Sequence, residues 1–243
     1  MRYAILSDVH ANLDALDAVL QDAAQQGVQG FVCLGDFVGY GPEPNECVER
    51  LRGRASVALV GNHDLAALGR LDARRFNLFA RAAVEWTRTQ LHDRTRAFLD
   101  ALSPRTEFEG MLLVHASPRD PVEEYILDWE TAEDNFRAEA FSVCLFGHTH
   151  VPMRFAHDGE RTRVLALLPN TPVALEPGLR HLVNVGSVGQ PRDGDPRAAY
   201  TVLDTEARTV EVRRVDYPIE SVQRKMQACG LPRPLWERLA EGR

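Results

Sequence analysis

The sequence has few cysteines and no long hydrophobic run. Its four cysteines, Cys33, Cys47, Cys144 and Cys229, are far apart in the chain. Cys33 and Cys144 lie inside apolar segments, so we interpret them as reduced core thiols and not as disulfides or zinc ligands. The apolar run after Met1 is far too short for a signal peptide or a membrane span. A cytoplasmic location without membrane attachment is therefore the default expectation.

The chain also has fewer basic residues than acidic residues. The chain has 28 Lys and Arg residues against 35 Asp and Glu residues, which gives a formal net charge of −7. Loose binding to nucleic acid depends on a basic surface, so this balance argues against a nucleic-acid polymer as partner. A local positive site remains possible if metal ions supply it. With 243 residues, the chain is long enough to bury a large core.

The apolar pattern predicts strands that alternate with helices in the first half of the chain. Strand-length apolar runs, each ending in polar residues, occupy residues 3–8, 30–36, 56–62, 111–117 and 142–148. Amphipathic spacing predicts helices at residues 12–26, at 44–53 and over most of 73–102. This alternation is typical of an α/β architecture.

After residue 150 the pattern changes to short strands joined by tight turns. Residues 218–242 favour two helices separated by Gly230 and Pro232. We therefore predict an α/β (α+β) fold, a four-layer sandwich of two mixed β-sheets flanked by helices. We expect residues 1–243 to form a single domain with a helical C-terminal tail from about residue 218.

Polar residues of a restricted kind follow five of the predicted strands. They are Asp8 and His10, Asp36, Asn62 and His63, His115, and His148 and His150. The carboxyl ends of parallel strands meet at one edge of an α/β sheet, where ligands bind. The i, i+2 spacing within "DVH" and "HTH" places each pair on the same side of an extended segment. The sequence therefore predicts one site at the carboxyl ends of the strands.

The chemistry of this set indicates metal binding. Carboxylate, imidazole and amide oxygen ligands without thiolate suit manganese, iron, nickel, cobalt or zinc. Seven such groups are too many for one ion, but they suit two divalent ions about 3.5–4 Å apart that share a bridging carboxylate. Gly35, Gly61 and Gly147 adjoin these residues, where the chain must turn sharply. Each segment alone is weak evidence for a metal site, because a lone histidine after a strand is more often a core residue. The prediction rests on the ordered set of all five segments.

The series "DVH", "GD", "GNHD", an isolated "VH" and "GHTH" resembles the signature of the calcineurin-like metallophosphoesterases. The matching residues span 8–150, and the strand-rich remainder suits the second half of that double-sheet fold. The chain is most similar to the compact bacterial phosphodiesterase-type members. The resemblance implies two metal sites that share Asp36: the first is formed with Asp8, His10 and His150, and the second with Asn62, His115 and His148.

The same resemblance implies roles for the two residues that follow Asn62. His63 would face the substrate and give a proton or positive charge to the leaving group, and Asp64 would fix the tautomer of His63. A hydroxide held between the two ions would attack phosphorus in line with the leaving oxygen. The expected function is a metal-dependent phosphodiesterase or phosphatase that acts on a small or nucleotide-type phosphoester.

Two residues outside the motifs are candidates for substrate binding. Arg192, in "GQPRDG", could hold a phosphate, and the alternative is a surface turn with an ion pair. Asn12 could touch the substrate, although helix capping alone would explain it. Arg119 and Tyr125, which follow His115, are weaker candidates for the walls of the cleft.

The aromatic residues Phe76, Phe79 and Trp86 occur at helical spacing, which favours the core over a base-stacking platform. The stretch "GDFVGYG" lacks the arginine of the "GDxVDRG" motif in phosphoprotein phosphatases, which disfavours that branch.

Two other functions remain open. One is a catalytically silent metal-binding scaffold of the same fold; such a scaffold in the retromer lacks the catalytic histidine, whereas His63 is present here. The other is a nuclease, against which the net charge of −7 counts. The sequence does not separate a monoesterase from a diesterase, because the metal ions and His63 would serve both.

Overall fold

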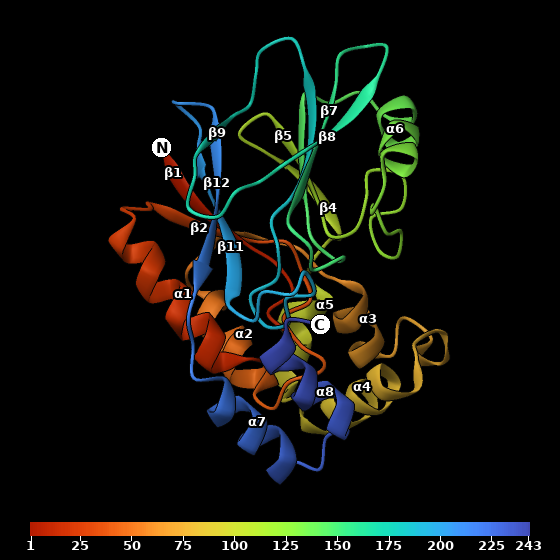
Figure 1. The fold of residues 1–243 in the computed structure, drawn as a ribbon. Coiled ribbons are helices and arrows are strands. Elements are labelled where there is room, and N and C mark those ends of the chain that lie inside the picture. The colour runs from red at the N-terminus through yellow and green to blue at the C-terminus, as the bar shows by residue number, and fades with distance from the viewer.

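Two six-stranded β-sheets form the centre of the computed structural model, which describes residues 1–243 (Figure 1). The strands of the first sheet are, in spatial order, β3 (Ala55–Ala58), β2 (Gly30–Cys33), β1 (Arg2–Leu6), β11 (Ala198–Asp204), β12 (Thr209–Val215) and β9 (Val173–Ala174). Those of the second are β4 (Arg105–Phe108), β5 (Met111–Val114), β6 (Val143–Phe146), β10 (Arg180–Asn184), β7 (Met153–His157) and β8 (Thr162–Leu165).

Both sheets are mixed, as predicted. In the first sheet β1, β2 and β3 are parallel, while β11, β12 and β9 continue the sheet in antiparallel pairs. In the second sheet β5, β6 and β10 are parallel, and β4, β7 and β8 are antiparallel to their neighbours. The parallel strands of each sheet deliver their carboxyl ends to one edge, and this edge carries the predicted polar residues.

The alternation of side chains along the strands separates the layers. In β1, Tyr3 and Ile5 belong to the core between the two sheets, whereas Ala4 and Leu6 pack on the helix side of the first sheet. In β6, Leu145 faces the other sheet, whereas Phe146 belongs to the core beneath a helix on the outer face. The molecule therefore has four layers, which confirms the predicted sandwich.

Helices cover the outer faces of both sheets (Figure 1). The helices that bury side chains in the core of the first sheet are α1 (Leu13–Gln25), α2 (Pro44–Arg52), α3 (Asn62–Leu68), α4 (Leu78–Gln90), α5 (Asp93–Asp100), α7 (Ile219–Ala228) and α8 (Arg233–Glu237). Helix α6 (Trp129–Ala138) alone packs on the second sheet, through Ala132 and Phe136. No helix is long and apolar enough to cross a membrane.

The structure departs from the predicted elements in several places. The helical region 73–102 is divided into a 3₁₀ turn, Ala73–Arg75, and helices α4 and α5. Asn77 starts a new helix there, because its side chain caps the backbone N–H groups of Phe79 and Ala80. Strand β4 and helix α6 were not predicted. The two helices of the tail, α7 and α8, are confirmed, as are free cysteines throughout.

Candidate metal centre

The carboxyl ends of β1, β2, β5 and β6 and the first turn of α3 bring all seven predicted ligands to one place. The ligand atoms of Asp8, His10 and His150 form one buried group, and those of Asp36, His115 and His148 form another. Within each group these atoms lie within 4.8 Å of one another. Five chain segments that are distant in sequence therefore meet at this edge.

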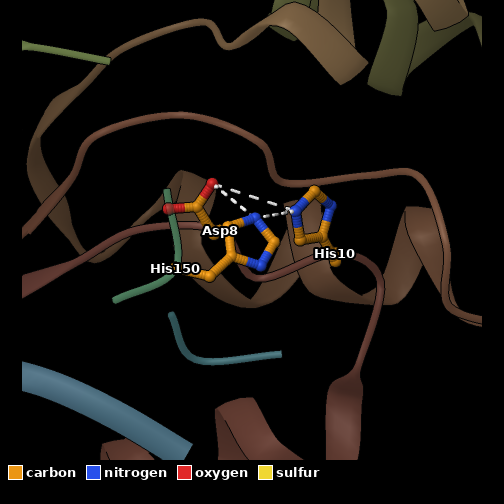
Figure 2. A group of neighbouring side chains, drawn as sticks. All are labelled: Asp8, His10 and His150. Atoms are coloured by element: carbon orange, nitrogen blue, oxygen red, sulfur yellow. Dashed lines mark hydrogen bonds and ion pairs between the residues drawn. The ribbon is translucent and has the colours of Figure 1, made fainter. Parts of the chain in front are cut away.

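The first group converges on a single point (Figure 2). Asp8 Oδ1 lies 3.3 Å from His150 Nε2 and 3.8 Å from His10 Nε2. The two imidazole Nε2 atoms are 3.0 Å apart. Two nitrogens and a carboxylate oxygen that face one another at such distances form a set of donors suited to a transition-metal ion.

Asp36 connects the first group to the second. Asp36 Oδ2 lies 3.7 Å from His10 Nε2 and 3.6 Å from His115 Nε2. Asn62 Oδ1 lies 3.1 Å from His115 Nε2, on the side of the second group. One carboxylate oxygen thus lies between the two groups, where a bridging ligand belongs.

Backbone carbonyl groups orient the imidazole rings. In three rings Nδ1 makes the hydrogen bond to the carbonyl and Nε2 faces the metal centre. His10 bonds to Val38 O at 3.1 Å, His115 to Leu34 O at 2.9 Å and His150 to Gln190 O at 2.6 Å. In His148, Nε2 makes the hydrogen bond instead, to Glu123 O at 3.2 Å, and Nδ1 is the nitrogen available to a metal ion. A ring that donates one N–H to a carbonyl presents the lone pair of its other nitrogen, as metal-binding histidines do.

The two carboxylates are each half-satisfied by hydrogen bonds. Asp8 Oδ2 accepts a bond from the N–H of His148, and Asp36 Oδ1 accepts one from the N–H of His63, both at 2.9 Å. The other oxygens, Asp8 Oδ1 and Asp36 Oδ2, are buried without any hydrogen-bond partner. Burying such atoms without a partner is costly, and a cation offsets that cost. The residues therefore fit two divalent metal ions.

The ionisation of the site agrees with this fit. Burial lowers the pKa of each histidine ligand, and that of His148 falls to about 3. The rings are therefore neutral near pH 7, the form that binds metals. Burial, with the charges of Asp64 and Asp8, raises the pKa of Asp36 well above its usual range. A carboxylate among like charges in a buried site favours a cation beside it.

His63 lies at the mouth of the centre and belongs to neither group of ligands. Its ring stacks on Phe76 with 4.7 Å between centroids, and it also lies 4.4 Å from the ring of Tyr40. These three residues line a cleft of about 180 Å³ together with Tyr125 and His148. Phe76 packs against the core, as predicted, and also lines the cleft, and Tyr125 lies in the cleft wall.

Asp64 does not have the role that the resemblance implies. Its Oδ1 accepts from the N–H of Val38 and its Oδ2 from the N–H of Gly61, both at 3.0 Å. The buried Nδ1 atom of His63 has no hydrogen-bond partner. Asp64 therefore does not fix the tautomer of His63. It is the third residue of α3 and caps that helix, a role that its spacing from Gly61 would have indicated.

Asn12 and Arg192 are the two candidates for substrate binding outside the motifs. Asn12 accepts from Ala15 N at 3.1 Å and donates to Gly189 O at 2.9 Å, so the predicted substrate contact gives way to the helix-cap alternative. Arg192 donates to Tyr40 Oη at 3.3 Å, which places it beside the cleft instead of in an ion-paired surface turn.

Arg119, a weaker candidate for the cleft wall, lies outside the cleft. It pairs with Glu124 and Asp134, both acids of its own neighbourhood, and it does not line the cleft.

A double-sheet sandwich with buried carboxylate and imidazole groups at its strand ends defines a metal-binding α/β protein. The family model of the calcineurin-like phosphoesterase superfamily domain matches residues 1–208. The chain belongs to this superfamily, which confirms the resemblance drawn from the motifs.

Similar proteins span nearly the whole chain. The uncharacterized protein MJ0912 of Methanocaldococcus jannaschii is 36% identical over 247 residues, which cover 99% of this chain and 98% of that protein. Phosphodiesterase YfcE of Escherichia coli is 26% identical over 221 residues, 86% of this chain and 91% of that one. The crystal structure of a metallophosphoesterase from Sphaerobacter thermophilus is 42% identical and superposes with a TM-score of 0.90, covering 100% of this chain and 99% of that one.

Proposed function

We propose that this protein is a hydrolase of phosphate esters that uses two divalent transition-metal ions, namely a phosphodiesterase or phosphatase that acts on a small or nucleotide-type substrate. One observation carries the proposal: the unpartnered Asp36 Oδ2 lies between two groups of buried ligands. Membership of a phosphoesterase superfamily and the likeness to a named phosphodiesterase support it.

The ligand residues would hold the two ions side by side. Asp8, His10 and His150 would bind the first ion, and Asn62, His115 and His148 the second, with Asp36 shared. When bound, such ions neutralise phosphoryl oxygens and make water a nucleophile at neutral pH. The buried surroundings of Asp8 and Asp36 strengthen the attraction between these carboxylates and cations.

His63 would act on the leaving group. Its Nδ1 is buried against Gly39, so Nε2 is the ring nitrogen left for a substrate in the cleft. Burial, with Arg192 and the neighbouring imidazoles, lowers the pKa of His63 well below its usual value. A phosphate anion in the cleft opposes that effect and favours the protonated ring. His63 would then donate the Nε2 proton to the leaving oxygen.

A panel of phosphoesters tests the proposal. The protein, loaded in turn with manganese, zinc, nickel or cobalt, should hydrolyse p-nitrophenyl phosphate or bis(p-nitrophenyl) phosphate, and the metal-free protein should not. Tight metal binding without turnover of any ester would favour the silent scaffold. Salt-sensitive cleavage of DNA without turnover of small esters would favour the nuclease.

A further inference from the structure

The C-terminal tail places a second arginine beside the metal centre. Arg238 begins a 3₁₀ turn, Arg238–Glu241, directly after α8. Leu235 and Leu239 on either side of it are buried in the main core, and the N–H of Gly194 bonds to Gly242 O at 2.9 Å. In Figure 1 the C-terminus accordingly lies near the strand ends. The side chain of Arg238 thus leaves a fixed backbone.

The guanidinium of Arg238 lies beside that of Arg192. Gln190 Oε1 accepts hydrogen bonds from both side chains. Both guanidinium carbons lie over the ring of Tyr40, at 4.9 Å from its centroid for Arg238 and 5.7 Å for Arg192. The Nε atoms of both arginines are buried without a hydrogen-bond partner. Two cationic side chains are therefore held together around two neutral partners.

No carboxylate of the protein pairs with either guanidinium. The nearby acids are engaged elsewhere, since Asp193 pairs with Arg214 and Asp195 with Arg197. Burial and the charge of Arg192 lower the pKa of Arg238. Two adjacent cations without a counter-charge destabilise a fold, and such an arrangement is typical of a site that binds an anion.

The pair lies against the first group of metal ligands. The ring of Tyr40, over which both guanidiniums lie, is 4.7 Å from the ring of His10. Tyr40 also lines the cleft. The backbone carbonyl of Gln190, whose side chain joins the two arginines, bonds to His150. An anion bound at the metal centre would therefore extend toward these arginines.

We propose that Arg238 and Arg192 form a subsite for phosphate oxygens of the substrate, and that it favours a dianionic phosphate over the monoanionic phosphate of a diester. Planar guanidiniums suit the oxygens of a phosphate, and two of them suit a double charge. The inference rests on the proposed phosphoesterase function. The family model ends at residue 208, so Arg238 lies outside the matched domain.

Kinetics with two esters of the same leaving group test the charge preference. With the metal-loaded protein, Arg238→Ala should lower kcat/KM for p-nitrophenyl phosphate, the dianion, by about 10- to 100-fold, mainly through KM. The value for bis(p-nitrophenyl) phosphate should fall less than about threefold, and Arg192→Ala should show the same preference. Arg233→Ala is the matched control, because Arg233 lies on α8, is exposed and pairs with Glu237. Equal losses for both esters would overturn the preference.

Binding of inorganic phosphate gives a second measurement that does not depend on turnover. Titration calorimetry on the metal-loaded protein should show affinity for phosphate weakened about tenfold or more by Arg238→Ala, and less by Arg238→Lys. If the wild type hydrolyses no ester but shows this loss, the proposed function fails and the subsite stands. If Arg238→Ala and Arg238→Lys both bind phosphate like the wild type, the subsite is refuted. Arg238→Lys, which keeps the charge, serves as the test variant if the alanine variant does not fold.

Discussion

Five of the candidate metal ligands have a backbone conformation that is costly for residues other than glycine. Their φ angles are 54° for Asp8, 49° for His10, 53° for Asp36, 63° for His148 and 61° for His150. A fold keeps such angles only where neighbouring structure enforces them. Here the backbone N–H of Asp8 bonds to Gly35 O at 3.0 Å, and that of His10 bonds to Asp36 O at 2.9 Å. The loops thereby turn side chains that follow different strands toward one centre.

Gly61 leaves the space that Asp36 occupies. A Cβ atom on Gly61 would lie 2.1 Å from Asp36 Oδ1 and 2.6 Å from the backbone nitrogen of Asp36. We expect Gly61→Ala to lower the free energy of unfolding by about 1–3 kcal/mol. It should also reduce metal content in both sites, because Asp36 is the shared ligand. Denaturant unfolding and elemental analysis would measure these effects. Gly53→Ala, at a glycine with no atom near its Cβ position, should change neither.

His63 should be separable from the metal ligands by mutation. His63→Ala should leave metal content near the wild-type value, because the ring belongs to neither ligand group. Turnover of an alkyl phosphodiester should fall by about 10²–10⁴, the usual contribution of a positioned proton donor. A nitrophenyl ester needs no proton to depart, so it should lose far less. Equal losses for both esters with the metals retained would mean that His63 stabilises phosphoryl charge instead.

At the scale of elements, the correct predictions rest on the periodicity of apolar residues and on the polar residues at strand ends. The strands that carry the ligands and helices α1, α2, α7 and α8 were predicted because their apolar residues follow a period of two or of 3.6. Strand β4 alternates exposed and half-buried positions at the sheet edge, so its apolar signal is weak. Helix α6 was missed although Asp128 caps it and Ala132 and Phe136 form its buried face. Phe76 was assigned only to the core and Tyr125 only weakly to the cleft wall, because both lie in connections, whose course depends on tertiary contacts.

A half-buried acid, Asp22, connects helix α1 to the first sheet. Its carboxylate accepts from Tyr200 Oη in β11 at 2.7 Å and from Arg213 in β12 at 3.0 and 3.1 Å. Asp22→Asn should lower the free energy of unfolding by about 1.5–3 kcal/mol, the range for hydrogen bonds to a charged group. Asp17→Asn should change it little, because the Asp17 side chain is 43% exposed, against 18% for Asp22.

The effect of Asp22 should depend on pH. Burial opposes its charge, but the hydrogen bonds from Arg213 and Tyr200 outweigh burial and lower the pKa of Asp22. A carboxyl with a depressed pKa in the folded state stabilises the fold above its unfolded pKa of about 3.9. This stabilisation is lost as the pH falls through the folded pKa. Unfolding curves of the wild type and Asp22→Asn should therefore converge below about pH 4. A gap that stayed constant there would contradict the charged interaction.

At the scale of the whole molecule, the metal centre joins the two sheets. Asp8 and Asp36 follow strands of the first sheet, whereas His115 and His148 follow strands of the second. The two sheets approach closely here, since the N–H of His148 bonds to Asp8 Oδ2. Metal ions bound by both sets would connect the two halves of the sandwich, so metal binding should stabilise the whole fold.

Removal of the metals should therefore change stability as well as activity. Each ion that binds only the folded state at 100 times its Kd adds about 2.7 kcal/mol. For a chain of this size that binds two ions, chelation should lower Tm by about 10–20 °C. Hydrolysis should stop on chelation and return with manganese or another first-row divalent ion. Asp36→Asn, which weakens both sites, should give a Tm that hardly responds to chelator, while Asp17→Asn should respond as the wild type does. Scanning calorimetry with and without chelator makes the comparison, and hydrolysis that survived thorough chelation would rule out the metal-dependent reaction.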